Sequence, residues 1–295
     1  MNELRDQATL ENVVVGKAEA TDPVVFTQDT ATNAAKNTSV IGGGGYFQKF
    51  VGDNGPTKNA AVTAATMRTT LIAEFKKNLP IPRTFLLDQQ EDAAGKAVQQ
   101  QTKTWLASRD QNAFYVYGNG FNGVQTTIDG ANLFSATHTT QNGDTVDNYY
   151  TGQLTDPNLN ISVVALRNQL AQTGVKLGYE PKFLLTPNAL HQTGMAVAKS
   201  VLRAGTGQND LNYWSEMYPG LKVVFNQFLD DISTTAWFIG STNHGVIRYE
   251  REAFFTDLVP WQTDPDDNYL YKMRAREEVD SIEYSGTNGN DGTTS

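Results

Sequence analysis

The spacing of hydrophobic and polar residues changes several times along the chain, and each change predicts a different element. From Ala94 to Trp105 apolar residues recur at helical spacing within a stretch rich in Gln and Lys. Asp88 and Glu91 have the spacing of an N-terminal capping box. A helix of roughly 25 residues is therefore predicted from Asp88 to about Ala113, and its narrow apolar stripe suits a helix lying along a sheet.

Strict alternation later in the chain predicts two long strands. They span Val246–Phe255 and Tyr269–Val279, and the connection Pro260–Asn268 suits an antiparallel pair. Ser285–Ser295, rich in Gly, Asn and Thr, is predicted to be a loose tail.

Between the predicted helix and these strands the pattern is that of a compact α/β unit. A helix through Val163 is expected to end at Gly174, and a second helix is expected over Asn188–Arg203 after an N-capping Thr-Pro pair. Short apolar runs predict further strands at Phe183–Leu185, Val223–Phe225 and Trp237–Ile239.

The first part of the chain has no continuous amphipathic period. Residues 1–45 are predicted to be an extended arm ending at the hinge Gly42–Gly45. Residues 46–82 are predicted to form a long β-hairpin, with a turn at Asp53–Pro56, a strand at Met67–Phe75 and prolines that stop regular structure. The hairpin either extends away from its own domain or packs on it.

Composition narrows the class of protein. The 295 residues carry a net charge of −9, and the longest basic run is Lys76-Lys77, which disfavours direct nucleic-acid binding. Only 19% of residues are charged, so many surface positions must be neutral and polar, as in faces that meet other subunits. No cysteine is present, and no apolar run approaches the ~18 residues of a membrane span.

Candidate catalytic and metal-binding motifs are weak. His138, His191 and His244 share no motif with a nucleophile, and His138 is expected to pack or hydrogen-bond in its loop. Asp264–Asn268 lacks the glycine and the glutamate that a calcium loop requires. The acid pairs at 230–231 and 277–278 are interpreted as charged solvent faces. We therefore predict no catalytic, cofactor or metal site.

One segment carries a resemblance. Asp129, Gly130, Leu133, Phe134 and His138 have the order of a "D-G-x-x-L-F-x-x-x-H" signature that follows a long helix and precedes an α/β domain. This order resembles the major capsid proteins of tailed bacteriophages, in the Mu-like major head subunit branch of the Hong Kong 97-type fold. The residue before His138 is Thr137, where that signature customarily has an acid.

The resemblance implies an α+β capsid fold and a function in assembly. Its parts would be an N-terminal arm (1–45), an extended loop (46–82), a peripheral domain with a long spine helix (83–150 and 246–284), an axial domain (151–245) and a flexible tail (285–295). Such a subunit would assemble in the host cytoplasm as pentamers and hexamers, with a portal and scaffolding or decoration proteins, into an icosahedral shell around double-stranded DNA. It would not read the DNA sequence, and no membrane would be involved. The alternatives are an encapsulin-like nanocompartment shell and a glycan-active enzyme.

Subunit contacts are expected at the extended loop. Three aromatic residues there, Phe47, Phe50 and Phe75, are candidate anchors in a neighbouring subunit. Lys76, Lys77 and Arg83 form the basic cluster near the hairpin and are candidate partners for acidic residues of a neighbour.

Overall fold

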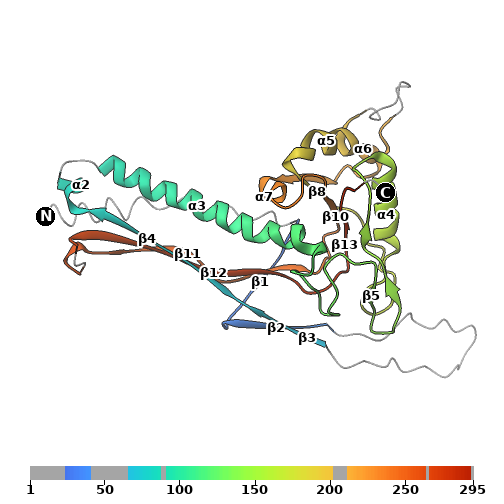
Figure 1. Cartoon of the computed structure of the whole chain (residues 1–295), viewed down its shortest axis with the longest axis horizontal. Helices are drawn as coiled ribbons and strands as arrows, with labels where there is room; N and C mark the ends of the chain where they lie inside the picture. The colour runs from blue at the N-terminus through green and yellow to red at the C-terminus, as the bar shows by residue number, and fades with distance from the viewer. Residues whose placement is uncertain (1–23, 41–65, 88–90, 202–210, 264–265, 294–295) are drawn as a thin grey trace, which may run out of the picture.

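The computed structural model describes residues 24–40, 66–87, 91–201, 211–263 and 266–293. It has an elongated body in which a long helix lies over one face of a four-stranded sheet, and a second sheet with shorter helices forms the other end (Figure 1). The first sheet has the spatial order β1 (Thr27–Thr30), β11 (Val246–Val259), β12 (Asn268–Ser281) and β4 (Ala73–Pro82). Only the β1–β11 pair is parallel; the β11–β12 and β12–β4 pairs are antiparallel.

The long helix is α3 (Glu91–Gly118), and the short α2 (Arg83–Leu87) connects it to β4. It extends five residues beyond the predicted end at Ala113, while Asp88 of the predicted capping box lies outside the described residues. The predicted end was too early because the helical spacing gives way to an aromatic run that includes Phe114 and Tyr117, and this run was interpreted as the end of the helix. Both rings are buried where the two sheets meet, and this packing keeps the segment helical.

Strand β4 contradicts the expectation that Pro80 and Pro82 stop regular structure. Its ten residues pair with β12 from Ala73 to Pro82. Proline has no backbone N–H to donate to a neighbouring strand. Pro80 and Pro82 are tolerated because β4 is the edge strand of the described sheet, and backbone nitrogens two residues apart can both face its unpaired side. The four-stranded sheet therefore includes residues 73–82, which were predicted to belong to the extended loop.

A two-stranded ribbon projects from the body (Figure 1). It consists of β2 (Ala35–Val40) and β3 (Thr66–Leu71), paired antiparallel. The predicted strand Met67–Phe75 is thus two strands, which separate at the buried Ile72. One ribbon strand comes from the stretch predicted to be the arm, and the predicted turn at Asp53–Pro56 lies outside the described residues.

The second sheet has the order β7 (Tyr149–Tyr150), β13 (Thr287–Asn290), β10 (Trp237–Gly240), β8 (Phe183–Pro187) and β9 (Lys222–Asn226). Around it lie the helices α4 (Asp156–Asn168), α5 (His191–Lys199), α6 (Tyr213–Met217) and α7 (Gln227–Asp230). Short elements complete the described chain: η1 (Asn119–Phe121), β5 (His138–Thr139), β6 (Thr145–Val146), η2 (Asn188–Leu190) and η3 (Trp261–Thr263).

Helices α4 and α5 are shorter than predicted. Helix α4 begins after the N-cap Thr155 and ends at Asn168, whereas Gly174 takes its positive φ in a later turn. The segment predicted as one helix from Asn188 begins with a 3₁₀ turn, and α5 ends at Lys199, since the following Ser200 is extended. Arg203 lies outside the described residues.

The predicted loose tail is wrong. Residues Thr287–Asn290 form β13, which is fully buried between β7 and β10. Two asparagine side chains fix it to helix α4, because Asn288 donates to the Ser162 carbonyl (2.9 Å) and Asn290 donates to the Ser162 hydroxyl (2.9 Å). Small and polar residues are therefore used here for close packing and internal hydrogen bonds.

A buried ion pair lies on the four-stranded sheet. The Arg248 guanidinium on β11 bonds the Glu277 carboxylate on β12, and both side chains are about 95% buried. Glu278 accepts a hydrogen bond from Asn112 of α3 (3.1 Å). The acid pair at 277–278 is thus not a solvent face, as its sequence suggested, because both side chains find partners inside the body.

We expect Arg248→Met to destabilise the folded chain by about 3–5 kcal/mol, because Glu277 keeps its charge without a partner. The double variant Arg248→Met/Glu277→Leu should recover most of the loss. Arg274→Met is the matched control, since Arg274 pairs with Glu252 at the surface (2.8 Å) and should cost about 1 kcal/mol or less. Urea unfolding measures all three, and a double variant as unstable as the single one would contradict this account.

Candidate assembly surfaces

The signature segment forms a hydrogen-bonded loop in which Leu133, Phe134 and His138 are buried. Gly130 has φ +81°, a backbone conformation that favours glycine and that closes the turn after Asp129. The Asp129 carboxylate accepts from the backbone nitrogens of Ala131 (3.2 Å) and Thr139 (3.2 Å), and from the Thr127 hydroxyl. The carboxylate therefore holds both ends of the loop together.

His138 is the other half of this loop. Its Nδ1 lies 2.8 Å from Asp129 Oδ2, its Nε2 lies 3.2 Å from the Leu133 carbonyl, and its ring stacks on Tyr284 with centroids 4.4 Å apart. The ring is fully buried. The expectation that His138 packs and hydrogen-bonds in its loop is confirmed.

The electrostatics of the loop are dominated by Asp129. Burial alone raises the pKa of this carboxyl group, but hydrogen bonds from His138 and Thr127 outweigh burial and lower the pKa to about 2. The charged form is therefore favoured in the folded state, and its contribution to stability is complete above the pKa of the unfolded chain, near 4.

Asp129→Asn is expected to lower the free energy of unfolding by about 2 kcal/mol at pH 7. As pH falls from about 4 through about 2, Asp129 takes up a proton in the parent chain, and the difference between parent and variant should shrink. Asp147→Asn serves as the control, because Asp147 is an exposed carboxylate bonded to Tyr149 N (2.9 Å) in the neighbouring turn. A parent–variant difference that stays constant from pH 7 to pH 2 would show that Asp129 does not act through its charge.

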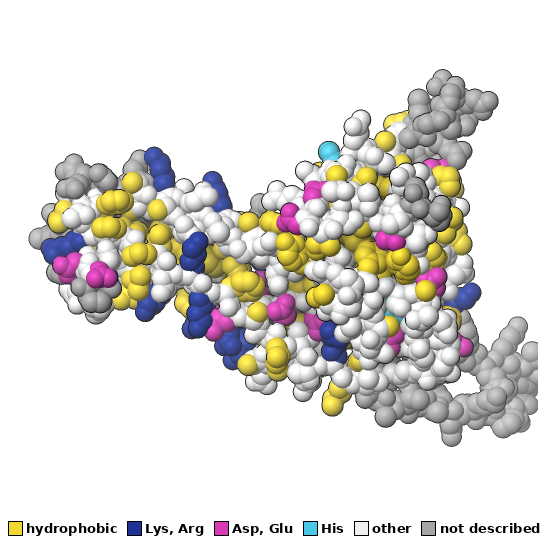
Figure 2. All heavy atoms as spheres, viewed as in Figure 1, with side chains coloured by type: hydrophobic (Ala, Val, Ile, Leu, Met, Phe, Trp, Pro, Cys, Tyr) yellow, Lys and Arg dark blue, Asp and Glu magenta, His cyan; other side chains and the backbone are white. Residues whose placement is uncertain are grey.

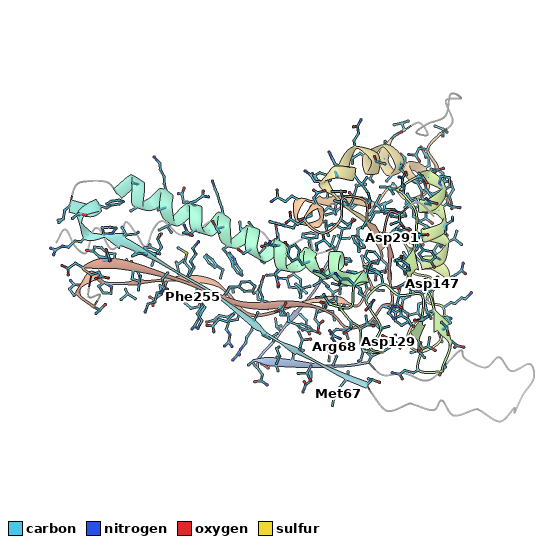
Figure 3. The ribbon with its side chains drawn as sticks, in the orientation of Figure 1. Met67, Arg68, Asp129, Asp147, Phe255 and Asp291 are labelled. Atoms are coloured by element: carbon cyan, nitrogen blue, oxygen red, sulfur yellow. The ribbon has the colours of Figure 1, made fainter. Side chains whose placement is uncertain are left out.

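A second buried carboxylate, Asp280 at the end of β12, anchors the ribbon to the body. Arg68 of β3 donates to it from Nε (2.8 Å) and Nη2 (2.7 Å). Thr70 Oγ1 (2.5 Å) and Gln125 Nε2 (2.9 Å) donate to the same carboxylate. A two-pronged guanidinium contact fixes orientation as well as distance, so it sets the angle at which the ribbon leaves the body. Arg68 and Met67, labelled in Figure 3, lie on this ribbon strand.

The other ribbon strand has its own contact with the sheet. Thr38 Oγ1 lies 2.6 Å from Tyr249 Oη, and Tyr249 packs with Ile72 and Ile282 in a small buried cluster. The outer face of β3 is exposed: Met67 is 69% and Leu71 is 73% exposed. Large apolar side chains four residues apart on one projecting strand favour a surface that another molecule covers.

Further exposed apolar residues lie at both ends of the body. Phe85 and Leu87 of α2 lie at the outer end, where Figure 2 shows hydrophobic side chains gathered on the left. At the end that holds the five-stranded sheet, the exposed apolar side chains include those of Met195, Val201, Leu211, Tyr213, Met217 and Phe225. These two groups and the ribbon are the candidate assembly surfaces.

Of the six site residues predicted from sequence, the structure describes four, and these four do not form one cluster. Phe75 is half-buried on β4 and packs edge-on against Trp105 of its own chain (5.2 Å). Lys76 pairs with Glu74 on the same strand (3.0 Å), and Lys77 follows it, exposed. Arg83 begins α2, six residues further along the chain.

The other two predicted residues, Phe47 and Phe50, lie outside the described residues. Sequence reasoning missed Arg68 and Asp280, which no local pattern links, since 212 positions separate them. It also missed the pocket beside Trp105. The apolar stripe predicted that Trp105 is buried, but no pattern shows that the half-buried Gln101 lines a pocket with it.

The described residues contain no group of His, Asp and Glu side chains that could hold a metal ion. None of the helices in the described ranges is long and apolar enough to cross a membrane.

Comparison with known proteins gives the family. Residues 72–287, more than two thirds of the chain, match the family model described as phage capsid protein. The chain belongs to the phage capsid protein family. No curated protein sequence matches it.

Solved structures place this capsid protein in the Hong Kong 97-type fold. A structure from Mycobacterium phage Adephagia is 16% identical, with a TM-score of 0.57 over 96% of this chain and 94% of the other. The capsid of Myoviridae phage XM1 is 12% identical, with a TM-score of 0.50 over 96% and 98%. A virus-like particle from Pyrococcus furiosus is 9% identical, with a TM-score of 0.51 over 97% and 95%.

These likenesses confirm the α+β capsid fold, and with the family match they make the chain a major capsid protein of the tailed-phage type. The family match is to phage capsids, and nothing in the comparisons supports a nanocompartment function or a glycan-active enzyme.

Proposed function

We propose that this capsid protein is the repeating subunit of a closed icosahedral phage head, arranged as pentamers and hexamers around double-stranded DNA. The observation that carries the proposal is the anchored ribbon. It projects from an elongated two-sheet body, in a chain that matches the phage capsid family (Figure 1).

The arrangement of parts supports an assembly role. The four-stranded sheet with α2 and α3 is the peripheral domain, and the five-stranded sheet with its helices is the axial domain. Exposed apolar residues lie at the ends of both and on the ribbon, so each subunit offers contacts in several directions. Several such faces on one subunit are what a closed shell requires, because contacts must propagate in two dimensions.

Charge supports the container role. A net charge of −9 gives a wall that does not attract packed DNA, and we infer that the DNA is enclosed without sequence-specific contact. The virion is then the final location, reached by assembly in the cytoplasm of the bacterial host. A portal and scaffolding or decoration proteins are the partners that we propose for the shell.

The direct test is to express the chain and examine it by size-exclusion chromatography and negative-stain microscopy. Closed particles of megadalton mass are the expected result. A monomer or small oligomer under all conditions of salt and concentration would exclude self-assembly by this chain alone.

Arg68→Gln should reduce the yield of closed particles at least tenfold, because the ribbon loses the guanidinium that fixes its angle. Lys36→Gln is the matched control. Lys36 is also on the ribbon, but its pair with Asp29 (3.0 Å) is partly exposed and contributes about 1 kcal/mol or less. Equal particle yields from the two variants would show that the angle of the ribbon does not govern assembly.

The aromatic candidates are expected to separate into two groups. Phe47→Ala and Phe50→Ala should lower particle yield while leaving the urea unfolding of the dissociated subunit unchanged. Phe75→Ala should lower both, since Phe75 packs on Trp105 within its own chain. Full particle yield from the variant carrying all three changes would exclude these residues as intersubunit anchors.

A further inference from the structure

A small pocket lies between helix α3 and the four-stranded sheet, beside the edge strand β4. Its volume is about 150 Å³. Phe75, Trp105, Phe254 and Met273 supply its apolar lining. An apolar cavity of about 150 Å³ in a protein is large enough to hold a benzene ring. One six-membered ring can therefore enter this pocket.

The aromatic side chains of the lining hold one another in fixed orientations. Phe254 stacks on the Trp105 indole, with ring centroids 5.4 Å apart and an angle of 7° between the planes. Phe75 meets the same indole edge-on, at 5.2 Å and 68°. Stacked and edge-on contacts are the two arrangements that aromatic pairs favour. A planar ring that enters the pocket meets aromatic groups that are already oriented, so little side-chain freedom is lost on binding.

The two hydroxyl groups on the helix side of the pocket have already used their protons. Thr104 donates to the Gln100 carbonyl (3.0 Å), and Ser108 donates to the Thr104 carbonyl (2.9 Å). Each hydroxyl has one proton to donate, so neither can donate to an anionic group of a ligand. A charged donor for a ligand must therefore come from the strand on the other side of the pocket.

Lys77 of β4 is that donor. Residues two apart on a strand face the same side, so Lys77 shares the helix-facing side of β4 with Phe75. It is exposed, and no acidic side chain in the described ranges pairs with it. Lys76 also lines the pocket, but its ammonium group pairs with Glu74 (3.0 Å). An ammonium group without an acid of its own, beside an aromatic pocket, favours a ring that carries a carboxylate.

We propose that this pocket binds a monocyclic aromatic carboxylate. The ring lies against Trp105, and the carboxylate accepts a hydrogen bond from the Lys77 ammonium group at the rim. The bound ligand joins α3 to β4, which in the described sheet pairs only with β12. Every residue of the site belongs to one subunit, so binding does not depend on shell assembly.

Met273 offers a direct reporter, because it lines the pocket and the chain has only five methionines. The unassembled full-length chain is labelled with ¹³C at its methionine methyl groups and titrated with benzoate. We expect the Met273 resonance, assigned with Met273→Leu, to shift until it saturates. The dissociation constant should be on the order of 1 mM, as for a ligand of about nine heavy atoms. Met195 and Met217, exposed beside the other sheet, should not shift.

Two pairs of variants identify the contacts. Lys77→Met should weaken benzoate binding about threefold to fivefold and leave the binding of benzyl alcohol, which lacks the charge, unchanged. Lys103→Met, at an exposed lysine of α3 outside the lining, should change neither. Thr104→Leu fills the pocket and should abolish both shifts, whereas Gln100→Leu, at an exposed position outside the lining, should not. Circular dichroism establishes that each variant folds.

Three outcomes would overturn the inference. A Met273 resonance that does not move at benzoate concentrations far above the expected dissociation constant would show that the pocket takes no such ring. Equal shifts of all methionine methyl groups that never saturate would show nonspecific contact alone. Benzoate binding that is as tight in Lys77→Met as in the parent chain would show that the carboxylate is not what the pocket selects.

Discussion

The pairing of strand β12 with a neighbouring strand on each of its two edges is the constraint on which the rest of the structure depends. β12 pairs with β11 on one edge and with β4 on the other, while the side chains of Tyr269, Tyr271, Met273 and Ala275 are buried beneath the spine helix. Further along the same strand, Glu277 holds Arg248 of the sheet and Asp280 holds Arg68 of the ribbon. The chain then continues into β13 of the other sheet. One strand thus connects the peripheral sheet, helix, ribbon and axial sheet, so a shift in its register would displace all four.

Periodicity predicted the elements whose stability is local. The spine helix, the two long strands and the short apolar strands of the axial domain all occur near the positions that their spacing indicates, because one face of each is buried against a neighbour. The ends were harder to predict. Phe114 and Tyr117 stay helical only because a distant aromatic cluster with Phe134 and Phe238 surrounds them, and no local signal reports that cluster.

The tail shows why composition misleads when packing is tight. A stretch of Gly, Asn and Thr is typical of loose chain, but here the glycines permit close approach: a Cβ at Gly289 would lie 2.5 Å from the Phe134 ring. Gly286 has φ +79°, and a Cβ there would lie 2.1 Å from the Asn243 carbonyl oxygen. The side chains of Asn288 and Asn290 both donate to Ser162 inside the body, to its carbonyl and to its hydroxyl. Polar residues in an interior of this kind specify one arrangement, because each has few alternative partners.

Several of the chain's charged side chains, like the asparagines of its C-terminal part, bond within the subunit. The signature loop could be located from its sequence. The motif does not show what its acid and histidine do, whereas the structure shows that Asp129 and His138 bond to each other and hold the loop together. Likewise Arg68, Arg248, Asp280 and Glu277 are used inside the subunit, where removing one partner would strand a charge. Only 19% of residues are charged, so neutral polar and apolar side chains make up much of the outer faces. Contacts between such faces are individually weak and little affected by salt, so a shell built from them would gain its strength from repetition around the lattice, with subunit shape fixed in advance by the buried ion pairs.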